Sequence, residues 1–373
     1  MKKQPIQYAV VGLGHIAQTA ILPAFQNCKG SRLRALVSGD TTKRKLLGRK
    51  YRVKQTYSYD EYDECLHSGE IDAVYLALPN HLHKEYTIRA AQAGVHVLCE
   101  KPMAVSAADC EEMIRACDDN KVKLMIAYRL HFEAATLKAI EIINTQKKIG
   151  DARIFQSIQS MPVNFPNIRT LPVSLGGGPT YDIGIYPINA ARYVFQDEPV
   201  LISAEPAFSD QPGLQDIEVS MSVTLKFPSE RLASFVYSFG TAKADAFRVA
   251  GTKGDLILDS AFTYEGGKSL IVTLNGKKNE RFFKARDQFA SELDYFSRCI
   301  RINEAPEPSG LEGLADVRII EAIYRSAQNH NAVQLAPVKK DKRPTVEQEI
   351  ARRPAVQPPD VIHAKPPSRK EAA

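Results

Sequence analysis

The first third of the chain alternates short apolar runs with amphipathic stretches. Five runs have the length and branched apolar content of buried strands, at residues 6–11, 33–37, 73–78, 96–100 and 122–128. Helical patterns lie between them, and one at 106–120 opens with Ser106 and Asp109 as a capping box. Since strands that alternate with helices form βαβ units, residues 1–128 are predicted to form a doubly wound parallel sheet of the α/β class.

After residue 128 the pattern changes to consecutive β-like runs flanked by helices. A helical pattern at 132–146 comes first, and two amphipathic helices at 288–300 and 313–328 close the body. The β-like runs lie at 152–160, 200–208, 218–227, 232–240, 246–252, 254–259 and 269–276. Residues 129–336 are therefore predicted to form an α+β domain with an open, largely antiparallel sheet. Because such a sheet usually covers its exposed face, we expect a homodimer or homotetramer formed through it.

The last segment, residues 337–373, differs in composition from the body. It holds seven of the 22 prolines and few large apolar residues, and nine Lys or Arg stand against five Asp or Glu. This segment buries too little apolar surface to offset the entropy of ordering, which predicts a disordered or loosely attached tail. A basic tail can bind nucleic acid, but a solvated extension accounts for this composition better.

Charge and cysteine usage indicate an ordinary cytoplasmic protein. The net charge of +6 lies mostly in the tail, the N-terminus lacks the pattern of a signal peptide, and no run of about 18 apolar residues predicts a membrane span. The six cysteines lack CxxC spacing, which suits reduced thiols. His81 and His83 stand two apart without a carboxylate or thiolate partner, so we expect no metal site.

A glycine motif follows the first predicted strand. It has the GxGxxA form and consists of Gly12, Leu13, Gly14, His15, Ile16 and Ala17. The first glycine permits a tight turn, the second lets backbone approach a pyrophosphate, and the N–H groups of the following helix would hold the phosphates. The strand, the motif and the helix together predict an N-terminal Rossmann domain that binds a dinucleotide.

The end of the second predicted strand bears on the choice between NAD and NADP. NAD enzymes usually place an acid there to bind the ribose hydroxyls, whereas this chain has Ser38 and Gly39, with Lys43 close behind. A hydroxyl and nearby cations suit a 2′-phosphate, so the sequence favours NADP over NAD. Asp40 lies two positions late and remains able to reach a ribose, and the cations at 43–45 also suit a solvated helix face.

Further motifs resemble the Gfo/Idh/MocA family, the glucose-fructose oxidoreductase family. They are EKP at 100–102, PNHLH at 79–83, YRLHF at 128–132, GGGPTYDIGIYPINAARY at 176–193, ELDYFSRCI at 292–300 and SGLEGLADVRIIEAIYRSAQ at 309–328. The resemblance covers the chain up to about residue 335 and leaves only the tail outside. It implies a Rossmann domain followed by an α+β domain whose open sheet often forms a dimer interface.

The resemblance also implies roles for individual residues. Lys101 would lie beside the nicotinamide, and Ser38 and Lys43 match positions that hold the 2′-phosphate. The residues expected to shape the cofactor pocket are Leu78, Pro79, Asn80, His83 and Glu100. Arg129 and Arg169 match arginines near the nicotinamide and the substrate. One departure is Ile168, where many members carry Trp, and it weakens the expectation of substrate stacking.

An acid and a phenol near the three glycines complete the candidate active site. Tyr186 stands where many members of the family carry the acid-base histidine, and Lys101 would favour its phenolate and stabilise a substrate oxyanion. Asp182 would orient the substrate or the lysine. The DxxxY variant resembles the branch with glucose-fructose oxidoreductase, xylose dehydrogenases and dihydrodiol dehydrogenases. Taken alone, Asp182 suits a helix N-cap and Tyr186 a core aromatic.

These features together favour an NADP-dependent oxidoreductase that transfers a hydride between nicotinamide and a sugar or polyol. Two alternatives stay open from the sequence. One is a dihydrodiol-type dehydrogenase that acts on a non-sugar cyclic diol. The other is a non-catalytic NADP-binding regulatory module, for which the basic tail would serve as a docking segment.

Overall fold

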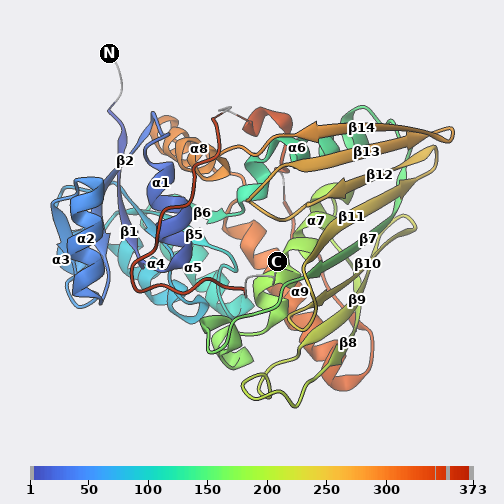
Figure 1. Ribbon diagram of the computed structural model, residues 1–373, viewed down its shortest axis with the longest axis horizontal. Coiled ribbons are helices and arrows are strands. Elements are labelled where there is room, and N and C mark those ends of the chain that lie inside the picture. The colour runs from blue at the N-terminus through green and yellow to red at the C-terminus, as the bar shows by residue number, and fades with distance from the viewer. Residues whose placement is uncertain (1–3, 341, 350–352, 369–373) are drawn as a thin grey trace.

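Two sheets side by side organise the chain in the computed structural model (Figure 1), which describes residues 4–340, 342–349 and 353–368. The first sheet has six strands in the order β3-β2-β1-β4-β5-β6, and all its pairs are parallel. Its strands are β1 (Ile6–Val11), β2 (Ser31–Val37), β3 (Gln55–Tyr57), β4 (Ala73–Leu76), β5 (His96–Glu100) and β6 (Leu124–Ala127). The predicted doubly wound parallel sheet is confirmed.

Helices cover both faces of this sheet, and the strand order reverses between β1 and β4. The helices are α1 (Leu22–Ala24, preceded by a π-helical Ala17–Ile21), α2 (Thr41–Tyr51), α3 (Tyr62–Leu66), α4 (His83–Gln92) and α5 (Ala107–Asp119). Ser106 caps α5 by accepting the N–H of Asp109 at 3.1 Å, which is one half of the predicted capping box. Ligands of doubly wound folds bind at the carboxyl ends of the strands where the order reverses, which here are the ends of β1 and β4.

The second sheet has nine strands in the order β14-β13-β12-β11-β7-β10-β9-β8-β15. They are β7 (Ala152–Ser160), β8 (Leu201–Ala207), β9 (Ser220–Phe227), β10 (Arg231–Ser238), β11 (Ala244–Gly251), β12 (Gly254–Asp259), β13 (Lys268–Leu274), β14 (Lys277–Phe283) and β15 (Val333–Gln334). Its pairs are antiparallel except β7 with β10, which is parallel. The prediction of a largely antiparallel sheet is confirmed.

Helices cover one face of the second sheet and leave the other open. They are α6 (Ala134–Ile140, continued by a π-helical Glu141–Thr145), α7 (Ile185–Phe195) and α9 (Gly310–Asn329). All three lie between this sheet and the first domain (Figure 1). The open face carries a central apolar group on the adjacent strands β7 and β10, in which each member is more than two-fifths exposed: Ile154, Ile158, Leu232 and Val236.

Helix α8 (Gln288–Ile302) returns the chain to the first domain. Asp294 on this helix accepts the backbone N–H groups of Lys29 and Gly30 at 3.0 and 2.8 Å, and Ser297 bonds the hydroxyl of Tyr8 at 2.9 Å. The buried residues Phe289, Leu293 and Phe296 pack into the core beneath β1 and β2. A segment far along the chain therefore completes the first core.

The described part of the tail differs from the sequence expectation of disorder, because it crosses the body through specific contacts. The buried amide of Gln348 donates to the backbone carbonyl of Glu307 at 2.8 Å, and Arg353 pairs with Asp294 at 2.8 Å. Further on, the backbone N–H of Asn164 donates to the carbonyl of Pro367 at 3.0 Å. Polar anchors hold this segment where its composition offers few apolar ones, and composition alone does not reveal them.

No helix within residues 4–340, 342–349 and 353–368 has the length and apolar content needed to cross a membrane. All six cysteines lie in the described residues and are unpaired.

Candidate active site and cofactor cradle

The glycine turn after β1 leaves room for a phosphate group. Gly12 has φ +91°, and a Cβ there would lie 2.4 Å from the carbonyl oxygen of Ala77, so only glycine fits. A Cβ on Gly14 would meet nothing within 4 Å, which means that open space lies over the start of the helix. The helix begins here, since Gln18 N–H bonds the carbonyl of Gly14 at 3.1 Å. These residues therefore fit a bound pyrophosphate.

The other predicted residues of this motif differ in burial. Leu13 is buried at 1% exposure and anchors the turn, whereas His15 and Ile16 stand half-buried in the first helical turn. Burial and the nearby guanidinium of Arg169 lower the pKa of His15. Because Arg169 belongs to the second domain, the cofactor motif and the predicted substrate residues face each other.

At the end of β2 the chain presents a hydroxyl and cations. Ser38 is buried at 3% exposure, and its hydroxyl accepts the N–H of Asp40 at 3.2 Å. Asp40 is the N-cap of α2, where its carboxylate accepts the N–H of Lys43 at 3.0 Å. The guanidinium of Arg44 folds back onto the carbonyl of Ser38. Arg44 is one of the three cations that the sequence places after Ser38, and its contact with Ser38 identifies it as the one that packs against the end of β2.

Gly39 and Lys43 also belong to the predicted cofactor site at the end of β2. This site and the glycine turn after β1 are together called the cofactor cradle. A Cβ on Gly39 would lie 3.3 Å from the ring of Tyr59, so the glycine lets an aromatic side chain pack against the backbone. Lys43 stands half-buried in the first turn of α2. The donor set of hydroxyl, lysine and arginine is the one that suits a phosphate group.

The loops after β4 and β5 are tied to each other and to the second domain. Asn80 Nδ2 donates to the carbonyl of Gly176 at 2.7 Å, next to Pro79. His83 is fully buried, with Nδ1 and Nε2 each 3.0 Å from a carbonyl, those of Pro102 and Leu78. Burial lowers the pKa of His83, and a neutral imidazole has a single N–H, so it donates to one of the two carbonyls. His83 thus shapes the pocket by joining its loops rather than by facing a ligand.

Lys101 and Asp182 meet across the two domains, as the sequence predicts. Lys101 Nζ donates to the backbone carbonyl of Asp182 at 2.8 Å and lies 3.9 Å from its carboxylate. Arg169 Nε donates to the other carboxylate oxygen at 2.7 Å. Before Lys101, Glu100 accepts the hydroxyl of Tyr75 at 2.8 Å, and burial raises the pKa of Glu100. The carboxylate of Asp182 therefore lies between two cations, Lys101 and Arg169.

Tyr186 lies between two cations. Lys101 Nζ is 4.5 Å from the centre of its ring, and Arg129, which is 6% exposed, donates to its hydroxyl oxygen at 3.1 Å. Burial would raise the pKa of Tyr186, but the charges of Arg129 and Lys101 outweigh it, so the pKa is lowered. The geometry thus favours a phenolate more than an ordinary tyrosine does.

The segment that carries Asp182 and Tyr186 is a helix whose start packs tightly against the preceding loop. The glycines before it allow close packing, because a Cβ on Gly177 would lie 1.7 Å from the carbonyl oxygen of Leu171. A π-helical turn (Thr180–Gly184) follows Pro179 and runs into α7. Asp182 lies inside this turn and bonds Arg169, so the N-cap interpretation of Asp182 is wrong.

Three residues that support the site were not found from the sequence. Glu218 accepts the N–H of Thr180 at 3.1 Å and so caps, from a distant loop, the helical turn that carries Asp182. Gln288 Oε1 accepts from Arg129 at 2.9 Å, and the ring of Phe262 stacks on Tyr186 at 5.9 Å. Each comes from an element that local patterns do not connect to the site, so no sequence signal marks it.

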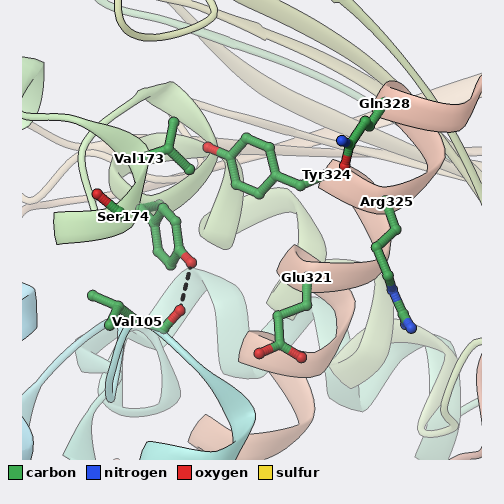
Figure 2. Close-up of a pocket in the computed structure, with 8 residues that line it drawn as sticks. Val105, Val173, Ser174, Glu321, Tyr324, Arg325 and Gln328 are labelled. Atoms are coloured by element: carbon green, nitrogen blue, oxygen red, sulfur yellow. Dashed lines mark hydrogen bonds between the residues drawn. The ribbon is translucent and has the colours of Figure 1, made fainter.

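A pocket of about 490 Å³ is lined by other residues than those of the site (Figure 2). Its lining combines the turn after β5, the loop before α7 and one side of α9: Val105, Val173, Ser174, Tyr181, Glu321, Tyr324, Arg325 and Gln328. The hydroxyl of Tyr181 donates to the carbonyl of Val105 at 2.7 Å and helps to close it toward the first domain. None of the predicted site residues lines this cavity. Among the described residues, no group of three or more His, Cys, Asp or Glu side chains is placed to hold a metal ion.

The glycine turn and the cluster of Lys101, Asp182 and Tyr186 have the arrangement expected of a dinucleotide-binding oxidoreductase, and comparisons with known proteins show that class. Residues 6–128 match the oxidoreductase family with an NAD-binding Rossmann fold, and residues 136–257 match the GFO/IDH/MocA C-terminal domain. A D-xylose 1-dehydrogenase (NADP+) of Haloarcula marismortui is 30% identical, over 89% of this chain and 93% of its own.

Solved structures give the same result. The aldose-aldose oxidoreductase of Caulobacter crescentus, complexed with glycerol, superposes with a TM-score of 0.85 at 38% identity, over 89% of this chain and all of its own. KijD10, a 3-ketoreductase of Actinomadura kijaniata in complex with NADP and TDP-benzene, shares the fold with a TM-score of 0.79 at 23% identity, over 87% of this chain and 98% of its own. The chain belongs to the GFO/IDH/MocA family of oxidoreductases.

Proposed function

We propose that this protein transfers a hydride between the nicotinamide of NADP and a CH–OH carbon of a sugar or polyol, with an aldose as the first candidate. The observation that carries the proposal is Tyr186, a partly buried phenol whose hydroxyl accepts from Arg129 at 3.1 Å and whose ring centre lies 4.5 Å from Lys101 Nζ. A phenol with a lowered pKa at a cofactor cradle is the base that oxidation of an alcohol requires.

NADP, when bound, would accept the hydride that leaves the carbinol carbon with both electrons of the C–H bond. The oxygen of Tyr186 would take the hydroxyl proton, leaving a carbonyl product. Lys101 would place positive charge near the alkoxide that develops as the proton leaves. Asp182, whose carboxylate accepts from Arg169 Nε at 2.7 Å, would accept a hydrogen bond from a neighbouring hydroxyl of the substrate and so orient the substrate.

Support for NADP comes from the cradle and from relatives. Ser38, Lys43 and Arg44 supply a hydroxyl and two cations at the end of β2, where a 2′-phosphate would lie. The xylose dehydrogenase relative is named for NADP+. Support for an aldose comes from that relative and from the aldose-aldose oxidoreductase. Ile168, 55% exposed in the loop before α7, offers an aliphatic side chain where many members of the family carry Trp.

The test combines a substrate panel with Tyr186→Phe. The purified enzyme is expected to reduce NADP+ with at least one aldose or polyol, and removal of the phenolic oxygen should lower kcat by about 10²- to 10⁴-fold. Tyr193→Phe is the matched control, since this buried tyrosine lies on the same helix with no hydrogen-bond partner for its hydroxyl among the described residues. Unchanged turnover in Tyr186→Phe, or no activity on any aldose or polyol, overturns the proposal.

We also propose that the open face of the second sheet joins two copies of the chain. Strands β7 and β10 place Ile154 beside Leu232 and Ile158 beside Val236 on this face, and each side chain is more than two-fifths exposed. Contiguous apolar patches of this kind mark protein interfaces. The variant Ile158→Lys with Val236→Lys should be monomeric by light scattering at a concentration where the parent is dimeric or tetrameric. A parent that is itself monomeric contradicts the proposal.

A further inference from the structure

The C-terminal tail contacts the helix that follows the glycine turn and also the segment after β2. In Figure 1 it runs in front of α1 before turning toward the second domain. The N–H of Ile362 donates to Gln18 Oε1 at 2.7 Å, and its carbonyl accepts from Gln18 Nε2 at 2.9 Å. Gln18 is only 1% exposed and also bonds the carbonyl of Leu13, inside the glycine turn, at 2.9 Å. The tail is therefore fixed at this point to a rigid, buried amide.

The next residue of the tail reaches the acid at the end of β2. His363 Nδ1 lies 2.8 Å from Asp40 Oδ2, while Asp40 Oδ1 accepts the N–H of Lys43 at 3.0 Å. Both carboxylate oxygens are thus used within the protein. The imidazole can donate from Nδ1 whether it is neutral or charged, so the contact does not depend on its titration.

Asp40 is the acid nearest to the place where NAD enzymes hold the ribose hydroxyls with a carboxylate. Without His363, Oδ2 of Asp40 would lose its donor while Oδ1 stays bound to the N–H of Lys43, and the free oxygen would repel a 2′-phosphate and attract a 2′-hydroxyl. It would also compete for the nearby cation of Arg44, whose guanidinium now bonds the carbonyl of Ser38 and, at 3.3 Å, the hydroxyl of Thr41. The contact with His363 holds the carboxylate away from both roles.

We propose that His363 selects the cofactor: by holding the carboxylate of Asp40, this tail residue leaves the adenosine 2′ position to Ser38 and Arg44 and favours NADP over NAD. The inference rests on the proposed function, because it assumes that this cradle binds NADP. It assigns to the tail a part in the cofactor site, and the anchor at Gln18 explains why the tail stays in place.

The experiment measures dissociation constants of NADP+ and NAD+ by calorimetry on the full-length protein stripped of cofactor. His363→Ala should weaken NADP+ by about tenfold and leave NAD+ unchanged or tighter, because a carboxylate oxygen that has lost its hydrogen-bond donor then lies near the phosphate. His330→Ala is the matched control, an exposed histidine 3.7 Å from the carboxylate of Glu205 on the second domain, and both constants should stay as in the parent. Melting temperatures confirm that all variants are folded.

A double-mutant cycle with Asp40→Asn separates the mechanism from a simple covering role. Once the charge at residue 40 is gone, His363→Ala should no longer change the ratio of the two constants. An equal loss of both cofactors in His363→Ala overturns the inference, because it shows that the tail only covers the site. An unchanged ratio overturns it too. If the parent prefers NADP+ the proposed function survives either result, whereas a parent that prefers NAD+ removes both.

Discussion

The two ends of helix α7 (Ile185–Phe195) carry ionic clusters of opposite character. At its start, Tyr186 lies against the cations of Lys101 and Arg129. Near its end, the guanidinium of Arg192 is fully buried and bonds Glu198, Glu312 and Asp316 at 2.7, 2.7 and 2.6 Å. One end thus has more cations than anions around its key group, and the other end surrounds its cation with carboxylates.

The difference shows that charged residues can change the reactivity of a neighbouring group or can stabilise the fold, depending on the charges around them. Around Tyr186 the excess positive charge lowers a pKa against the effect of burial. Around Arg192, burial acts to lower the pKa, but Asp316 and Glu198 hold it above its usual value, so the arginine stays charged and fixed. A buried charge that lies among groups of the opposite sign holds elements together, while an excess of one sign beside a titratable group changes the reactivity of that group.

The cluster at Arg192 also receives the beginning of the tail. Lys340 lies against Glu312 and is 3.4 Å from Glu307, and Arg343 pairs with Glu198 at 2.9 Å. The carboxylates around Arg192 thus bind cations from α7 and from the tail together. This explains why a proline-rich basic segment is ordered at its start.

The largest expected effect is on stability, at the end of α7 where carboxylates surround the buried cation of Arg192. Arg192→Met leaves Glu198, Glu312 and Asp316 buried without their shared cation, which should cost about 3–5 kcal/mol of unfolding free energy. A chemical denaturation series measures this cost. Arg153→Met is the control, because this exposed arginine pairs with an exposed Glu230 at 2.8 Å and should cost less than about 1 kcal/mol. Equal losses in the two variants would contradict the distinction between the two ends of α7.

A smaller effect is expected at Glu307, beside the same cluster. Burial acts to raise the pKa of Glu307, but His131 at 3.0 Å and Lys340 lower it to about 2, from an ordinary 4.5. Since the folded value lies below the unfolded one, the stability that Glu307 contributes is fully present above pH 4.5 and is lost as the pH falls toward about 2. Glu307→Gln should lower stability by about 1–3 kcal/mol at pH 7 and flatten the acid decline.

Melting temperatures measured from pH 7 down to acid denaturation provide the readout for Glu307→Gln. Glu304→Gln is the control, because this carboxylate is about half exposed and pairs with Lys342 at 3.0 Å on the surface. Lys342 also lowers the pKa of Glu304, but solvent screens this exposed pair, so the variant should leave the acid decline nearly as steep as in the parent. If both variants decline in parallel with the parent, Glu307 does not supply the acid dependence.

The fold could be predicted largely from hydrophobic periodicity, and its misses have physical reasons. Buried strands such as β4 and β6 consist of continuous apolar runs. Strand β14 (Lys277–Phe283) is an edge strand with six exposed residues, so it lacks that signal, and β3 (Gln55–Tyr57) is too short to show one. The tail is held by polar contacts with distant residues, which composition does not reveal. Cytoplasmic location, oligomeric state and the domain boundaries at 128 and 336 stay predictions.

The site could be predicted only as far as local motifs and family resemblance reach. Lys101, Asp182 and Tyr186 were expected together, and the structure brings them together. Glu218, which caps the turn that carries Asp182, and Gln288, which holds Arg129, come from segments whose local pattern has no connection to catalysis. Their contacts follow from how the two sheets pack, so they appear only in three dimensions.

The smallest expected effect is a shift of the pH profile at the start of α7. If Lys101 lowers the pKa of Tyr186 through its charge, Lys101→Met should raise that pKa, and the rise of kcat with pH in the oxidative direction should move by about one unit to higher pH. Lys101→Arg keeps the charge and should keep the parental midpoint, even where altered hydrogen bonding to the carbonyl of Asp182 lowers the plateau. The midpoint thereby separates charge from geometry. A midpoint that stays in place in Lys101→Met would show that Arg129 alone sets the pKa of Tyr186.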